Sequence, residues 1–281
     1  STNFVVQYVV EKYKTIGGVE SSAGTESGEF MNGYGYYMEG QNPLNFTTVG
    51  LDEGEYFYNF ETGADTSLPQ YMAGTLDAFL SDSNFFIRYT NSRTGVVTDI
   101  PFSTTGVRVF PRVHHTNLAD GNKTQLMRGS SVRWTGTFKP QCEPKYQPVV
   151  IDFINKYGSW ARIFFQKAKT RNITVKSDSY KANPSSLPYS PTAEGQVRNI
   201  NTTGQETIKL NTGFVNDGYG EYLQQLLLSE KINLLDSETS SQYQPVTVQT
   251  KSLKKQTGIN DGTINYELTF DFAFDIINNV V

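Results

Sequence analysis

The chain has 281 residues and a formal net charge of −4, with 37% hydrophobic and 19% charged residues. This apolar content is enough to bury a substantial core, which excludes a chain that is disordered throughout. The acidic balance excludes the overall basic footprint that nucleic-acid binding requires, and no apolar run reaches the roughly 18 to 20 residues of a membrane-spanning helix. We therefore expect neither a membrane nor a sequence-specific nucleic acid as a partner.

Abundant Tyr (17), Phe (18) and Gly (24) favour pleated, half-buried surfaces over helical bundles. The fold class expected is all-β, with two sandwich-like or barrel-like domains and one short amphipathic helix in the second. Three prolines between residues 139 and 148 oppose a continuous helix or central strand. The sequence thus predicts an N-terminal β domain at 1–139, a Pro-rich linker at 140–148 and a C-terminal β domain at 149–281.

The first half begins with a polar stretch and continues with strand-like runs. Residues 17–28 are rich in Gly, Ser, Glu and Thr and are predicted to form a loop. Residues 85–89 and 96–100 are β-type runs joined by a turn, which is typical of a hairpin. Two more strands are predicted at 107–113 and 131–138.

The second half opens with three β-type runs, at 149–154, 160–166 and 172–180, which predict a meander. Residues 182–205 carry three prolines among small polar residues and are predicted to form a long loop, of the kind that is often ordered against a partner. Apolar residues then recur at three- and four-residue spacing over 219–227, which predicts an amphipathic helix of about three turns.

The last part of the chain shows the clearest pattern. From Ile264 to Ile276 every second residue is apolar, while polar and acidic residues fill most of the positions between them. A single strand of this length extends on the order of 45 Å. With residues 245–255 as its antiparallel partner, it predicts a long terminal hairpin at 245–277.

We found no pattern that indicates catalysis, so no catalytic residue, metal ligand or cofactor is assigned. The two histidines, His114 and His115, are adjacent, and neighbouring strand residues point to opposite faces. Asp52, Glu53 and Glu55 lie close together, which fits a solvated acidic loop better than the carboxylate pair of a glycosidase. A polysaccharide-degrading enzyme is therefore the weakest of the functional hypotheses.

Two surfaces are candidates for recognition. The rings of Tyr34, Tyr36 and Tyr37 alternate with glycine and could stack on a sugar, although the same rings fit core packing or an interface. Residues 156–181 are basic and the final strand is acidic, so identical copies could contact one another head to tail and close a ring. The interface candidates are Trp160, Arg162, Lys167, Lys169, Arg171, Glu267, Asp271 and Asp275.

The second half resembles a family of structural proteins from the virions of tailed bacteriophages, especially those of Bacteroidetes hosts. The resemblance covers about residues 149–281, and no single motif carries it. The segments that carry it are Phe-Ile-Asn-Lys-Tyr-Gly-Ser-Trp at 153–160, Lys-Ser-Asp-Ser-Tyr-Lys at 176–181, Leu-Leu-Leu-Ser-Glu-Lys-Ile at 226–232, Pro-Val-Thr-Val-Gln-Thr-Lys-Ser-Leu at 245–253 and Tyr-Glu-Leu-Thr-Phe at 266–270.

The resemblance implies a non-enzymatic tail or baseplate component, repeated in a ring and docked to other tail proteins. Its partners would be its own copies and other virion tail proteins, and it would be assembled in the host cytoplasm and located in the virion tail. The start of the sequence, which lacks the basic and apolar regions of a secretory signal, fits this expectation. The alternative is a carbohydrate-binding or receptor-binding module that uses the tyrosine cluster.

Overall fold

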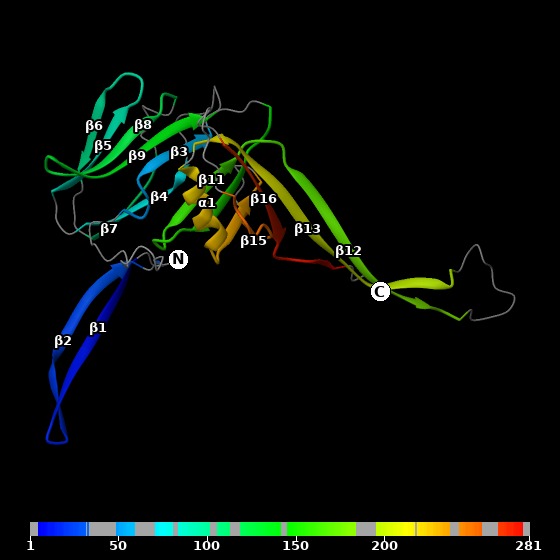
Figure 1. Ribbon diagram of the computed structural model, residues 1–281, viewed down its shortest axis with the longest axis horizontal. Helices are drawn as coiled ribbons and strands as arrows, with labels where there is room; N and C mark the ends of the chain where they lie inside the picture. Colours follow the sequence, from blue (N-terminus) through cyan, green and yellow to red (C-terminus); the bar gives the residue numbers. More distant parts are fainter. Residues whose placement is uncertain are drawn as a thin grey trace.

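The structure is a computed structural model, and it describes residues 5–31, 33, 49–59, 71–80, 84–101, 106–112, 119–141, 145–183, 195–216, 218–236, 242–254 and 264–277. These residues form an all-β fold with one short helix, as predicted from the composition (Figure 1). The strands belong to four sheets: one of eight strands, one of five and two of two strands each.

The first half contains nine strands, of which β1 and β2 form a separate two-stranded hairpin. Their bounds are β1 (Val5–Ile16), β2 (Val19–Met31), β3 (Gly54–Asn59), β4 (Tyr71–Leu80), β5 (Phe85–Asn91), β6 (Val97–Pro101), β7 (Gly106–Arg112), β8 (Asn122–Arg128) and β9 (Ser131–Gln141). The loop predicted at 17–28 is therefore wrong. Gly17 and Gly18 have φ of 59° and 83° and make a two-residue turn, which glycine allows without steric cost, so the polar residues after them continue as a strand.

Five of these strands form one sheet in the order β3-β9-β8-β5-β6, and its register confirms the predicted β5–β6 hairpin. The pairing of β3 with β9 is parallel. The strand predicted at 107–113 is β7, but it pairs with β4 in a separate sheet. Strand β9 runs through Pro140 to Gln141, so the first two residues of the predicted linker belong to a strand. Proline is tolerated there because β8 pairs with β9 only as far as Phe138.

The second half contains an eight-stranded sheet that curls on itself. Its strands are β10 (Val149–Ile154), β11 (Trp160–Phe165), β12 (Thr170–Lys181), β13 (Val197–Val215), β14 (Ile232–Leu235), β15 (Gln244–Val248), β16 (Ile264–Phe272) and β17 (Ile276–Ile277). The order is β11-β10-β14-β15-β16-β13-β12, with β17 paired to β13. Just after β11, the Lys167 N–H donates to the Asn211 carbonyl of β13 at 3.4 Å, and Phe165 meets Phe270 edge to face. These contacts give the sheet a barrel-like shape.

Three predictions for this half need correction. Strand β12 does not pair with β11, so the meander stops after two strands. The predicted loop at 182–205 is too long, because β13 begins at Val197 and pairs with β12. Strand β15 is the antiparallel partner of the terminal strand, as predicted. The terminal strand breaks after Phe272, however, and the described residues of the two strands pair over three register positions, so the hairpin is shorter than the predicted 245–277. The predicted alternation holds as far as Phe270, whereas Phe274 is 71% exposed.

The predicted helix is α1 (Tyr219–Leu228), and it lies where the two halves of the chain meet. Its Tyr222 contacts Tyr56 of β3 and Phe153 of β10, both edge to face. The buried apolar residues of the two halves belong to one continuous cluster that runs from Val49 to Phe270. The described parts of both halves therefore share a core across the proposed boundary.

Candidate assembly interface

Two long β-hairpins project from the body in different directions (Figure 1). We call β1–β2 arm 1, and we call β12 with the outer part of β13, residues 197–206, arm 2. Every residue of β12 is exposed, and so is each residue of β1 and β2 from Val9 to Ser27. A two-stranded ribbon in water is marginally stable at best, because it has no third layer on which to bury its side chains. Arms of this length therefore indicate surfaces that a partner covers.

Both arms carry large apolar side chains in solvent. On arm 1 these are Val9, Val10, Tyr13, Ile16 and Val19, and on arm 2 they are Ile173, Val175, Tyr180, Val197 and Ile200. Their exposed fractions lie between 44% and 70%. Single exposed apolar residues are ordinary, but runs of them along strands at the edge of a sheet are typical of an interaction surface.

Arm 2 is anchored at its base by charge. Arg171 binds Glu206 at 3.0 Å and Asp236 at 2.5 Å, and Lys169 binds Asp236 at 3.0 Å. Burial raises the pKa of the Asp236 carboxyl, but hydrogen bonds from Lys169 and Arg171 outweigh this effect and leave the pKa below its ordinary value. The guanidinium of Arg171 also lies over the ring of Phe272. Two of the predicted interface cations are thus engaged within the subunit.

Arg162 lies inside the subunit, although the sequence predicted it at an interface. It is 7% exposed and lies directly opposite Asp152 in the β10–β11 pair. Its Nε and Nη2 each donate to one Asp152 carboxylate oxygen at 2.6 Å. Five of the six residues of β10 are buried, so the charges of Asp152 and Arg162 must be neutralised within the subunit.

The other interface candidates occupy mixed environments. The side chain of Trp160 is covered by the ammonium of Lys231, and the aliphatic stem of Lys167 lies against Gly213. On β16, Glu267 forms an ion pair with Lys209 of β13. Asp271 is half-buried with one enclosed carboxylate oxygen that has no hydrogen-bond partner among the described residues, and Asp275 is exposed. Arg162, Lys169, Arg171 and Glu267 therefore already form ion pairs within the subunit.

Several charges further along the arms have no ion-pair partner among the described residues. These are Lys176, Lys181 and Arg198 on arm 2 and Glu20 on arm 1. The sequence analysis included Lys176 and Lys181 in the basic stretch 156–181, but it named neither of them, nor Arg198, as an interface candidate, because it did not place them on a projecting hairpin. The two glycines at the turn of arm 1 were the signal that could have revealed the first hairpin.

The acidic loop at 52–55 joins the two halves of the chain. Asp52 accepts hydrogen bonds from Tyr157 at 2.5 Å and from Gln225 at 2.6 Å, and Lys156 lies 3.1 Å away. Glu53 accepts from the Thr135 backbone N–H.

Glu55 completes this junction. A hydrogen bond from Lys139, helped by one from Asn216, lowers the pKa of Glu55 although burial opposes the change. Lys139 belongs to β9 of the first half, and Asn216 precedes α1 in the second half. The contact therefore ties the two halves together through a carboxylate that stays ionised at neutral pH.

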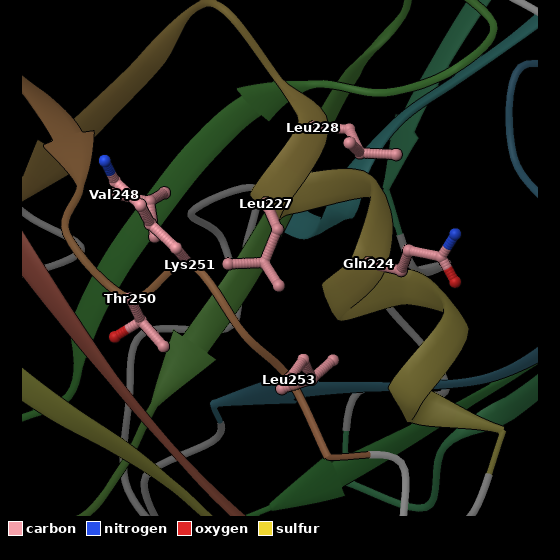
Figure 2. Close-up of a pocket in the computed structure, with 7 residues that line it drawn as sticks. All are labelled: Gln224, Leu227, Leu228, Val248, Thr250, Lys251 and Leu253. Carbon is pink, nitrogen blue, oxygen red and sulfur yellow. The ribbon is translucent and has the colours of Figure 1, made fainter.

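One hollow of about 400 Å³ lies between α1 and the segment that follows β15. Figure 2 shows Leu227 and Leu253 reaching toward the same space from these two elements. The remaining lining residues are Gln224, Leu228, Val248, Thr250 and Lys251. This lining includes no carboxylate, so it offers no acid–base pair for hydrolysis.

Metal and membrane features were also sought in the described parts of the chain. No group of three or more His, Cys, Asp or Glu side chains there is arranged to hold a metal ion. The helical residues that the structure describes include no segment long and apolar enough to cross a bilayer. Tyr34, Tyr36 and Tyr37, and the histidine pair, lie outside the described residues. Neither a scan of protein-family models nor a search of curated proteins finds a match to this chain.

Proposed function

We propose that this chain is a non-enzymatic structural subunit of a tailed-bacteriophage virion, which forms a ring in the tail or baseplate and docks other tail components. The observation that carries the proposal is the pair of projecting arms. Strand β12 is exposed over all 12 residues, and among the described parts of the chain no strand pairs with its outer edge. Such edges bind other chains readily, and a subunit of a ring presents them to its neighbours.

The body of the molecule supports the same reading. It is a packed β framework in which the charged groups at the junction of the halves, Asp52 and Glu55, bind other residues of the chain. A rigid body with long arms can build a repeating contact without a catalytic centre. The resemblance of residues 149–281 to phage virion proteins supplies the biological setting of the proposal.

The test is the assembly state of the full chain. We expect light scattering coupled to size-exclusion chromatography, and negative-stain electron microscopy, to find closed rings of several copies. A matched variant replaces residues 177–202 with Asn-Gly and so joins Lys176 to Thr203, which are directly paired in register. This variant should keep the circular dichroism spectrum of the body and stay monomeric. A wild-type chain that stays monomeric at high concentration, and is absent from purified virions, refutes the proposal.

A further inference from the structure

We infer that copies of this chain join arm to arm, with the outer edge of β2 in one copy pairing with the outer edge of β12 in the next. The inference rests on the proposed ring and names the contact that builds it. The partner is a second copy of the same chain. The contact is an added strand, in which main-chain hydrogen bonds supply affinity and side chains supply selectivity.

Among the residues that the structure describes, both edges are open in the single chain. Strand β12 is the last strand in the order of the eight-stranded sheet, and the one described strand that pairs with β2 is β1. The two strands also match in length, with 13 residues in β2 and 12 in β12. Pairing along this length would satisfy a row of backbone N–H and C=O groups that each arm leaves to water.

The charges on arm 1 determine which of its two edges can pair with β12. Strand β2 has three glutamates, at positions 20, 26 and 29, and no lysine or arginine. Strand β12 has three cations, at 171, 176 and 181, against Asp178 alone. The other edge of arm 1 is β1, which carries Lys12 and Lys14 against Glu11 alone, so its net positive charge would meet the cations of β12. Only β2 is complementary to β12.

The spacing of the charges favours an antiparallel pairing. Glu20 has no ion-pair partner among the described residues, whereas Glu26 forms an exposed ion pair with Lys12 within arm 1, which it would exchange for, or share with, a cation of the neighbouring copy. Glu20 and Glu26 are six residues apart, and Lys176 and Lys181 are five apart. When Glu26 lies opposite Lys176, Glu20 lies within one residue of Lys181. The third cation of β12, Arg171, is already held by Glu206 and Asp236 at the base of the arm. An antiparallel register therefore uses the two lysines that are free.

The direction of the arms makes the contact intermolecular. Arm 1 and arm 2 leave the body in different directions, so they do not meet within one chain (Figure 1). A contact between two different surfaces of identical copies is heterologous. It propagates from copy to copy and closes into a ring when the rotation between neighbours allows it.

Charge reversal gives the main test, measured by sedimentation of the full chain. Glu20→Lys with Glu26→Lys, or Lys176→Glu with Lys181→Glu, should each weaken self-association at least about tenfold. An equimolar mixture of the two variants should assemble again, because each mutated arm then meets a complementary one. Lys14→Glu on β1 and Arg198→Glu on β13 are matched controls. They change the charge of the same arms away from the pairing edges and should leave assembly within about twofold.

A carbodiimide cross-link identifies the contact directly. The reagent joins a carboxylate to a neighbouring amine with loss of water, and a mixture of ¹⁴N- and ¹⁵N-labelled chains marks the links between copies. We expect links from Glu26 to Lys176 and from Glu20 to Lys181.

Two results would overturn the inference. If the wild type assembles while both reversals leave assembly unchanged, or the cross-links avoid β2, the arm pairing is wrong and the proposed function stands. If the wild type never assembles, the proposed function falls and the arm pairing falls with it.

Discussion

Removal of one partner from the Asp152–Arg162 pair should strongly destabilise the subunit. Their side chains are 11% and 9% exposed, and two hydrogen bonds of 2.6 Å join them. Arg162→Met leaves the carboxylate of Asp152 buried without its counter-charge. A buried ion left alone in this way costs about 3–5 kcal/mol. We expect Asp152→Leu to cost a similar amount, because it leaves the guanidinium unpaired.

The double variant distinguishes a buried pair from a solvated one. With Asp152→Leu and Arg162→Met together, no isolated charge remains, and the free energy of unfolding should return to within about 1–2 kcal/mol of the parent. The assay is urea unfolding followed by the fluorescence of Trp134 and Trp160. It is carried out on the arm-shortened chain, so that assembly does not add to the measured stability.

The refuting result is equally specific. If each single variant loses less than about 1 kcal/mol and the two losses add, water reaches the pair and the burial of Arg162 described above is wrong. Arg162 would then again be available to a neighbouring subunit, as its sequence context first suggested.

Three further predictions address packing, backbone and pH. Phe270→Ala should lower the free energy of unfolding in urea by about 3–5 kcal/mol, because the ring is fully buried. Phe274 is 71% exposed, so Phe274→Ala should change this free energy by less than about 1 kcal/mol. Equal losses in the two variants would contradict the assigned faces. Gly121→Ala should lower the thermal midpoint more than Gly95→Ala. Both glycines have positive φ, but only at Gly121 would a Cβ lie 2.6 Å from a carbonyl oxygen; the reverse order would refute the geometry. Burial raises the pKa of Tyr89 from its ordinary value near 10 to about 12, so the contribution of this group to stability should be constant below pH 10 and fall by on the order of 2–3 kcal/mol as the pH rises to 12. Tyr89→Phe should show a shallower fall of stability above pH 10, and an identical slope would refute the shift.

Local patterns in the sequence predicted most of the strands but few of their partners. The alternation from Ile264 to Phe270 and the spacing within 219–227 each depend on neighbours in sequence, and both were confirmed. The parallel pairing of β3 with β9 joins residues about 80 apart, and no local signal encodes such a contact. The prediction of a loop at 182–205 was wrong from Val197 onward, where β13 begins, for a related reason. Polar, apparently aperiodic residues can form a strand when no face of that strand is buried.

The interface was harder to predict than the fold. The basic stretch at 156–181 was recognised, but its members proved to have different roles. Arg162 is internal, Lys169 and Arg171 anchor arm 2, and only Lys176 and Lys181 reach the exposed hairpin with no ion-pair partner among the described residues. Charge patterning shows how much charge a segment carries. It does not show which of the charges the chain itself neutralises, because that depends on tertiary contacts.

The parallel β3–β9 pair also has a consequence for synthesis. Strand β3 ends at Asn59, and its partner β9 is complete only when Gln141 has been added. At a synthesis rate of about 5–20 residues per second, the edge of β3 that later pairs with β9 stays unpaired for several seconds while the chain is still on the ribosome. A nascent chain of this kind needs protection from other growing copies, which carry the same adhesive hairpins. Translation speed and chaperone supply, as well as sequence, will therefore set the yield of folded chain.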